Sequence, residues 1–379
     1  MAALTFINNT LFDHGASAQI GAVLATHKIK RPLLCTDKGL VELGMVRDLA
    51  AKLSNDVSLS IFDGTPENPT QLAVEEAVKL YLELGCDGVI ALGGGSSMDL
   101  AKAVALAVTH EGDLINYTAG LGGVQKIGTV APLVAIPTTA GTGSEVSNGA
   151  VIIMKNGEKL ILASKHLVPL TAICDPELTL GLPPFLTAAT GMDAVTHCIE
   201  ALLSPVINPP AEAVACDGIE RAVKSGSLLR AFKDGSDIDA RWEMMMAATE
   251  GAMAFTKGLG AVHSMSHACG ADQRLRLHHG TLNAVILPTI LDFNRDHVGK
   301  KFERLNKAMG LGSSDDPAEY IRRLNADLGL PENLSEMGVQ ASNISSLARH
   351  AAKDVCTFTN PRPCSADDYE ALYRVEIAK

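Results

Sequence analysis

The sequence has few aromatic residues and no excess of positive charge. Phenylalanine, tryptophan and tyrosine make up 4% of the 379 residues, and the formal net charge at pH 7 is −11. Nucleic acids and anionic membranes attract basic surfaces, and proteins that hold unpaired bases stack them on aromatic rings. We therefore expect neither a nucleic acid nor a membrane as a partner.

Cysteine clusters and long apolar runs are also missing. The eight cysteines are scattered without any C-x-x-C pair, which argues against a disulfide framework and against a thiolate zinc site. No apolar run reaches the roughly 20 residues that cross a bilayer. Residues 1–17 do not show the basic and then apolar pattern of a signal peptide. These absences predict a cytoplasmic protein with reduced thiols.

The first half of the chain predicts an α/β domain. Short apolar runs alternate with segments of helical spacing, which is typical of parallel strands joined by crossover helices. The expected strands are residues 31–37, 57–62, 87–92 and 133–136, and the expected helices run to about Leu53, over residues 70–84, and from residue 95 to about His110.

The second half predicts a helical domain. Alanine-rich, helix-favouring stretches cover residues 185–203, 210–232 and 240–258, and runs of β-branched residues become scarce. Two prolines near residues 181–184 would interrupt regular structure. We therefore place an α/β domain at residues 1–181 and a helical domain at residues 182–379.

Two loops rich in glycine and hydroxyl groups each follow an expected strand. The first contains three glycines at residues 93–95, and the second spans residues 137–145. Such loops bring backbone amides and a helix N-terminus close to phosphate groups. Either loop alone could be a tight turn without a ligand, but two after two strands favour a nucleotide diphosphate. Ser96 and Asp99 have the spacing of a capping box, which predicts where the following helix begins.

Asp37 stands at the end of the first expected strand. A carboxylate in that position commonly binds the adenosine ribose and repels a 2′-phosphate, which favours NAD over NADP. The alternative is an aspartate that caps the helix following it.

Histidines and one aspartate are spaced to share helix faces. Asp193 with His197 and His263 with His267 are i, i+4 pairs, and a His-His-Gly sequence follows at residues 278–280. Three imidazoles and a carboxylate suit a divalent first-row metal, whereas a single buried histidine is usually a core residue. The H-E-x-x-H and G-x-S-x-G motifs of metallopeptidases and serine hydrolases are absent.

Taken together, these segments resemble the iron-containing (group III) alcohol dehydrogenase family. The resemblance implies an α/β nucleotide-binding domain followed by an all-α metal-binding domain, a fold like that of dehydroquinate synthase. It also implies an NAD-dependent enzyme that uses Fe²⁺ or Zn²⁺ and assembles as a homo-oligomer, a dimer. The motifs that carry the resemblance are residues 36–39, 68–70, 93–102, 137–145, 175–176, 191–200, 208–209, 263–267 and 279–284.

The resemblance also implies roles for individual residues. The metal ligands would be Asp193, His197, His263 and His279; His267 would lie near the nicotinamide and the proton path, and Phe255 would lie by the substrate. The residues expected to contact NAD are Asp37, Asn68, Gly94, Gly95, Ser96, Asp99, Thr138, Thr139, Thr142, Ser147 and Lys159.

The substrate is expected to be a primary alcohol or aldehyde. Residues 208–211, 257–260 and 277–284 look most like the family members that interconvert 4-hydroxybutyrate and succinate semialdehyde. Arg274 or Arg276 could then hold the substrate carboxylate, unless both side chains simply face water. One alternative is a dehydrogenase for a neutral alcohol or diol of the lactaldehyde/1,2-propanediol type. The others are a metal-dependent hydrolase, a lyase of the same fold that recycles NAD, and a non-catalytic nucleotide-binding protein.

Overall fold

A computed structural model describes residues 8–271, 275 and 277–378 of the chain. Among these residues the chain forms two compact units. The sheet unit contains residues 8–139 and 143–179, and the helical unit contains residues 140–142 and the described residues from 180 onward. An α/β N-terminal part and an all-α C-terminal part confirm the predicted fold class.

The sheet unit is built on six parallel strands. Their order is β1-β8-β5-β4-β2-β3, so the chain crosses over between strands that are not neighbours in sequence. The strands are β1 (Asn9–Phe12), β2 (Pro32–Cys35), β3 (Ser60–Phe62), β4 (Gly88–Gly93), β5 (Leu133–Pro137) and β8 (Thr171–Cys174).

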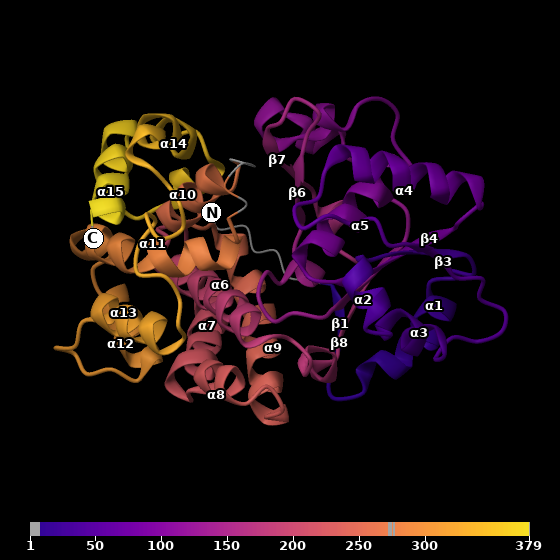
Figure 1. Cartoon of the computed structure of the whole chain (residues 1–379), viewed down its shortest axis with the longest axis horizontal. Coiled ribbons are helices and arrows are strands. Elements are labelled where there is room, and N and C mark those ends of the chain that lie inside the picture. The colour runs from indigo at the N-terminus through magenta and orange to yellow at the C-terminus, as the bar shows by residue number, and fades with distance from the viewer. Residues whose placement is uncertain (1–7, 272–274, 276, 379) are drawn as a thin grey trace. The chain divides into compact units, whose positions relative to one another are not determined.

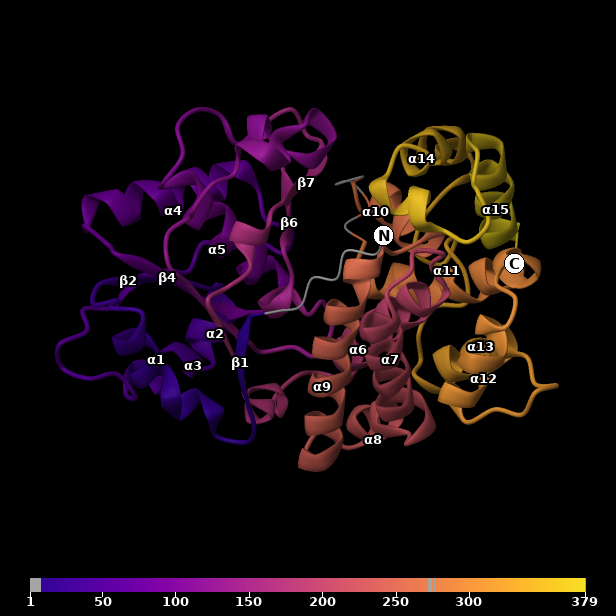
Figure 2. The same cartoon turned by 180° about the vertical axis from the view of Figure 1, so that it is seen from behind.

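Helices cover both faces of this sheet, as Figures 1 and 2 show from opposite sides. Successive residues of a strand point to opposite faces. Leu33 of β2 accordingly packs in the core under α4 and α5, while Leu34 packs in the core under α1 and α3. The helices of this unit are α1 (Ile20–Thr26), α2 (Lys38–Glu42), α3 (Met45–Ala50), α4 (Gln71–Glu83) and α5 (Gly95–Ala107).

The sequence missed several strands of the sheet unit. β1, β8 and an antiparallel hairpin of β6 (Gly149–Ile153) and β7 (Lys159–Ala163) were not expected. The strand expected over residues 57–62 is confined to Ser60–Phe62, because the amide of Val57 closes a turn onto Ser54. These strands contain only three to five residues each, too few for a clear alternating pattern.

Two of the expected helices are divided in the structure. The helix expected up to about Leu53 is divided into α2 and α3 where the chain turns at Gly44. The stretch expected as one helix over residues 210–232 consists of α7 (Pro209–Ile219), a π-helical turn at Glu220–Lys224, and α8 (Ser227–Lys233).

The helical unit packs around α6. This helix is buried on most of its surface and contacts α7, α9 and α11. The helices of this unit are α6 (Pro184–Leu203), α7 (Pro209–Ile219), α8 (Ser227–Lys233), α9 (Ile238–Ala254), α10 (Ala261–Gly270), α11 (His279–Asn294), α12 (Lys301–Met309), α13 (Pro317–Asp327), α14 (Ile344–Ala351) and α15 (Ala366–Ala378).

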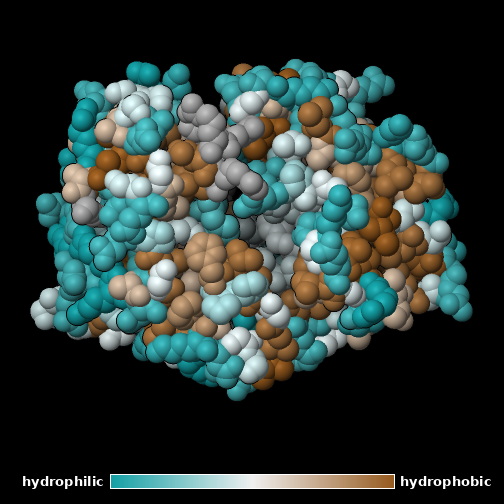
Figure 3. Space-filling model, in the orientation of Figure 1, coloured by the Kyte–Doolittle hydropathy of each residue, from teal (hydrophilic) through white to brown (hydrophobic). Residues whose placement is uncertain are grey.

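The surface mixes polar and apolar residues. On the face in Figure 3, hydrophobic residues are interspersed with hydrophilic ones, which is ordinary for a folded protein. Among the described residues, every helix is too short or too polar to cross a lipid bilayer.

Candidate active site

Helix α6 places three of the site residues on one face. Asp193, His197 and Glu200 are spaced at i, i+4 and i+7, so they line up along the helix. Asp193 is 2% exposed, His197 is 4% exposed and Glu200 is 6% exposed. Polar side chains so deeply buried need partners, and the neighbouring helices supply them.

Helix α10 contributes two histidines from the same face. His263 is 1% exposed, and its ring stacks on that of His197 with centroids 4.7 Å apart. His267, one turn later, is only partly buried, and its ring stacks on that of His279 at 5.4 Å. The predicted i, i+4 pairing on a helix is therefore present in α10.

Helix α11 begins at His279, which brings the fourth predicted ligand to the same place. His278 caps this helix, and its side chain accepts a hydrogen bond from the amide of Thr281. A Cβ atom on Gly280 would lie 2.2 Å from the carbonyl oxygen of Ala189 on α6. Only glycine allows this approach, which sets His279 beside Asp193.

The three predicted histidine ligands converge on the carboxylate of the fourth, Asp193. Its Oδ1 atom lies 3.7 Å from Nε2 of His197, 3.9 Å from Nε2 of His263 and 3.6 Å from Nε2 of His279. Two ligand atoms that share a tetrahedral Zn²⁺ or a similar ion are roughly 3.4 Å apart, given bonds of about 2.1 Å. The spacing and the three-nitrogen, one-oxygen donor set fit a divalent transition metal.

The side-chain amide of Asn283 lies beside three of the four predicted ligands, Asp193, His263 and His279. Its Nδ2 donates to Asp193 Oδ1 at 2.7 Å and faces Nε2 of His263 and of His279 at 3.2 Å each. Its Oδ1 is buried and accepts no hydrogen bond from the described part of the chain. The amide group therefore faces one carboxylate oxygen and two ring nitrogens that surround the same place, as the ligands of a cation do.

Burial keeps His197 in the protonation state that a ligand needs. Desolvation lowers the pKa of His197 to about 4, against the smaller opposite effect of the Asp193 charge. The imidazole is therefore neutral at pH 7, and a neutral imidazole offers a lone pair to a metal.

His267 has a carboxylate partner of its own. Its Nδ1 donates to Oδ2 of Asp354 at 2.9 Å. Burial alone would raise the pKa of Asp354, but the charge and hydrogen bond of His267 and the amide of Cys356 lower it to about 2. Asp354 thus stays ionised and accepts the Nδ1 proton of His267, so the neutral form of this ring has its lone pair on Nε2.

The predicted substrate residues are placed in part. Phe255 follows α9, and its ring meets the ring of His197 edge-on with centroids 5.0 Å apart. Phe255 therefore borders the metal-ligand cluster. Arg274 and Arg276 lie outside the described residues.

Most of the residues predicted to contact NAD gather at one edge of the sheet. Asp37 follows β2, Gly94, Gly95 and Ser96 follow β4, and Thr138 and Thr139 follow β5. The carboxyl ends of parallel strands form the usual ligand-binding edge of an α/β sheet. A Cβ on Gly94 would come 3.3 Å from the Thr139 side chain, so the two predicted loops are neighbours.

The remaining predicted NAD residues lie on other segments. Lys159 of β7 donates to Oδ1 of Asn68 at 3.1 Å, which keeps a cation and an amide together. Ser147 accepts hydrogen bonds from the buried ammonium of Lys102. Thr142 belongs to the helical unit by its contacts.

The predicted capping box at Ser96 and Asp99 is wrong. Helix α5 begins at Gly95 with Gly94 as its N-cap, and no side chain caps it. Ser96 instead donates to the carbonyl of Glu67, and Asp99 accepts from Ser144 and from the amide of Val151. The β6–β7 hairpin, which the sequence did not reveal, competes for the Asp99 carboxylate.

The helix-capping alternative for Asp37 is present in the structure. Its Oδ1 accepts a hydrogen bond from the amide of Leu40 at 3.1 Å, at the start of α2. Capping by one oxygen does not occupy the other, so contact with the ribose stays a prediction.

Comparison with known proteins decides the family. The family model described as iron-containing alcohol dehydrogenase matches residues 8–176, and the model for the C-terminal part of the same family matches residues 187–377. The chain belongs to the iron-containing alcohol dehydrogenase family. As a member of that family, it is an oxidoreductase.

Individual relatives match over almost the whole chain. A 4-hydroxybutyrate dehydrogenase from Cupriavidus necator is 47% identical over 98% of this chain and 99% of its own length. The crystal structure of a 1,3-propanediol oxidoreductase superposes with a TM-score of 0.93 at 33% identity, covering 99% of this chain and 100% of that one. A sulfoacetaldehyde reductase from Bifidobacterium kashiwanohense, solved in complex with NAD⁺, gives a TM-score of 0.91 at 25% identity, covering 100% and 99%.

Three residues around the ligand cluster received no role from the sequence. Glu200 and Asn283 occur in the quoted motifs, and the i+3 spacing of Glu200 from His197 was the one available signal. Asp354 lies 87 residues from its partner His267 and had no local signal at all.

Proposed function

We propose that this enzyme is a metal-dependent dehydrogenase that transfers a hydride between NAD(H) and a primary alcohol or aldehyde. The observation that carries the proposal is the convergence of Asp193, His197, His263 and His279, in a chain of this family. The preferred substrates are 4-hydroxybutyrate and succinate semialdehyde, because a 4-hydroxybutyrate dehydrogenase is 47% identical over nearly the full length.

The four ligand residues would hold Fe²⁺ or Zn²⁺. Bound there, such an ion would act as a Lewis acid toward the oxygen of the alcohol or aldehyde. The protein's own contribution is to keep three imidazoles and one carboxylate directed at one place. Phe255 adds an apolar ring beside His197, which limits the access of water to that side.

His267 would exchange the alcohol proton with solvent. Its Nδ1 is held by Asp354, so the exchange takes place at Nε2. The side chain of His267 is 16% exposed, whereas that of His263 is 1% exposed. His267 therefore has the access to water that a proton relay requires and that a buried ligand does not.

The cofactor would be held at the carboxyl edge of the sheet. NAD supplies the hydride acceptor, and the protein binds and orients it. The first amides of α5 have no side-chain cap, so they are suited to a pyrophosphate. The full set of proposed NAD contacts is the one expected from the family resemblance, with Lys159 and Asn68 joined by a hydrogen bond.

Three further proposals concern the whole protein, and they rest on the composition of the sequence together with the family resemblance. Residues 1–181 and 182–379 would be its two domains, and the enzyme would be a cytoplasmic homodimer. The close match of the 1,3-propanediol oxidoreductase structure makes a neutral diol the second candidate substrate.

Absorbance at 340 nm tests the proposed reaction. Purified enzyme loaded with Fe²⁺ or Zn²⁺ is expected to oxidise NADH with succinate semialdehyde and to reduce NAD with 4-hydroxybutyrate. A panel of butanol, 1,3-propanediol and 1,2-propanediol measures the alternatives. Binding of NAD without any net turnover on the panel would favour the lyase or the non-catalytic protein instead.

Asp37 is expected to set the preference for NAD. Asp37→Asn keeps an oxygen for the amide of Leu40 and removes the negative charge that would repel a 2′-phosphate. We expect the ratio of kcat/KM for NADH over NADPH to fall about tenfold or more, since charge-assisted contacts contribute about 1.5–3 kcal/mol. Asp37→Gly should relax the preference in the same way with a slightly less stable α2. A wild-type enzyme that already prefers NADPH would contradict this role.

A further inference from the structure

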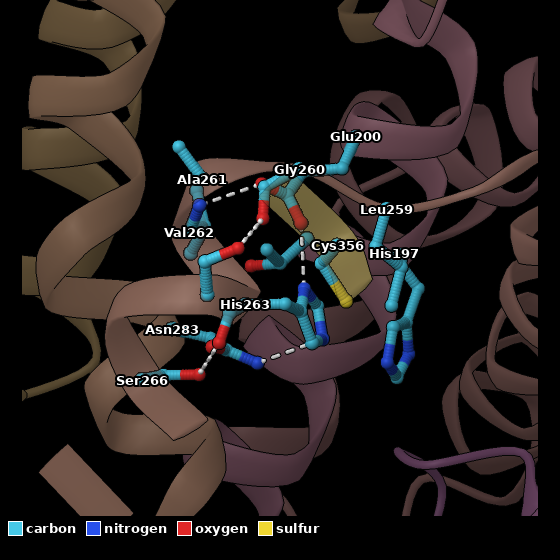
Figure 4. Close-up of polar contacts among 12 residues, drawn as sticks. His197, Glu200, Leu259, Gly260, Ala261, Val262, His263, Ser266, Asn283 and Cys356 are labelled. Carbon is cyan, nitrogen blue, oxygen red and sulfur yellow. Dashed lines mark hydrogen bonds and ion pairs between the residues drawn. The ribbon is translucent and has the colours of Figure 1, made fainter. Parts of the chain in front are cut away.

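Glu200 connects one predicted metal ligand to the beginning of the helix that carries it. Its Oε2 accepts a hydrogen bond from Nδ1 of His263 at 2.6 Å, and its Oε1 accepts one from the amide of Val262 at 2.7 Å. Figure 4 shows the carboxylate between these two groups, with the hydrogen bond to the His263 ring drawn as a dashed line. Both oxygens therefore act on helix α10.

The start of α10 depends on side chains from elsewhere in the fold. Its N-cap is Gly260, which has no side chain to satisfy the first amides. Asn360 accepts from the amide of Ala261 at 3.0 Å, and Glu200 accepts from the next one. A Cβ on Gly260 would lie 2.7 Å from Asn360 Oδ1 and 2.8 Å from Glu200 Oε1, so glycine is needed for both to reach the helix.

The hydrogen bond to Glu200 also determines which nitrogen of His263 is protonated. A carboxylate can only accept, so Nδ1 of His263 carries a proton, and the neutral ring then has its lone pair on Nε2. That Nε2 is the atom that faces Asp193 Oδ1 and Nδ2 of Asn283. The hydrogen bond at Nδ1 of His263 thus determines that the lone pair on the opposite nitrogen, Nε2, is directed at the ligand cluster.

We infer that Glu200 is a positioning residue for the metal: it holds His263 as the Nδ1–H tautomer and fixes α10 so that Nε2 stays directed at the ligand cluster. This inference rests on the metal site of the proposed function and adds a residue to it. Carboxylates in this position behind a histidine ligand typically change metal affinity 10–100-fold.

The variant Glu200→Gln distinguishes control of the His263 tautomer from stabilisation of the start of α10. A glutamine can accept from the amide of Val262 or from Nδ1–H of His263, but in either orientation its NH₂ group faces the other donor. If the amide of Val262 keeps its acceptor, His263 must shift its proton to Nε2, where it blocks the ligand lone pair. The helix keeps its cap while the tautomer is lost.

The experiment measures the dissociation constant of Zn²⁺ from the metal-stripped full-length protein, by competition with a chromophoric chelator. We expect Glu200→Gln to raise this constant 10–100-fold and to leave the Tm of the metal-free protein within a few degrees of wild type. The matched control is Glu376→Gln, which changes another buried glutamate of the helical unit that bonds to Thr289. The control should bind Zn²⁺ as the wild type does.

Equal Zn²⁺ affinity of Glu200→Gln and wild type would overturn the inference, and so would an equal loss in Glu376→Gln. ¹⁵N-histidine NMR of the metal-free wild type at pH 8.5 gives a second test that needs no stable variant at Glu200. A His263 signal with the proton on Nε2 would overturn the inference, and one with the proton on Nδ1 supports it. No Zn²⁺ binding by the wild type would instead overturn the metal site of the proposed function.

Discussion

Replacement of His263 or His279 by alanine is expected to abolish metal binding and turnover together. Each variant removes one of three imidazole nitrogens that lie within 4 Å of Asp193 Oδ1. Loss of a direct ligand should weaken metal binding more than about 100-fold, since loss of an outer-shell partner alone costs 10–100-fold. Metal content after gel filtration and NADH oxidation with succinate semialdehyde are the two measurements.

Two other histidines provide the comparison for that experiment. His267→Ala removes an imidazole from the same face of α10, but it should retain the metal and slow turnover or shift its pH profile, as expected for a proton relay. His297→Ala changes an exposed histidine of the same unit and should alter neither quantity. Full metal occupancy in His263→Ala or His279→Ala would show that the ligand assignment is wrong.

The enzyme is expected to prefer an aldehyde that carries a carboxylate. If Arg274 or Arg276 forms a charge-assisted hydrogen bond to the substrate, kcat/KM for succinate semialdehyde should exceed that for butanal by about tenfold to hundredfold. That range corresponds to a contribution of about 1.5–3 kcal/mol. Butanal has the same four-carbon chain without the charge, so the comparison isolates the carboxylate.

The arginine variants decide which side chain is responsible. Arg274→Ala or Arg276→Ala should lower kcat/KM for succinate semialdehyde and leave the value for butanal unchanged. Arg323→Ala, which changes an exposed arginine of α13, serves as the control and should affect neither aldehyde. Equal efficiency of the wild type on both aldehydes would rule out carboxylate specificity while leaving the dehydrogenase reaction intact.

The polar network around His263 and His267 explains how similar residues can have different roles. The two histidines are one helical turn apart on α10, and each donates its Nδ1 proton to a carboxylate. Glu200 comes from α6 and holds a fully buried ring, whereas Asp354 comes from the segment after α14 and holds a ring with access to water. Because both residues are histidines, the difference in burial distinguishes the proposed ligand, His263, from the proposed proton relay, His267.

Features that depend on neighbours in the chain could be predicted well. The i, i+4 spacing of Asp193 and His197, and of His263 and His267, requires only a helix, and α6 and α10 are both present. The buried strands β2, β4 and β5 consist of continuous apolar runs, which is typical of a parallel sheet covered on both faces. The positions of these helices and strands follow from local propensity and periodicity, which can be read from the sequence.

Other elements were missed or placed wrongly because their stability comes from distant partners. The β6–β7 hairpin is joined to α5 by the amide of Val151, which donates a hydrogen bond to the carboxylate of Asp99. From the sequence, that carboxylate was expected to serve a capping box. The short strand β1 exists through its pairing with β8, about 160 residues away along the chain, and four residues alone carry little periodic signal.

By itself, the sequence determined the fold class, the family and the types of side chain that could bind a metal, because these follow from motifs and periodicities within single segments. Only the tertiary structure decided that Asn283 faces three of the ligands, that Glu200 holds His263, and that Asp354 holds His267. The last two pairs are separated by 63 and 87 residues, so helix packing and not local conformation brings them together. Gly280 shows the physical reason, since the close approach of α11 to α6 at this glycine places His279 beside Asp193.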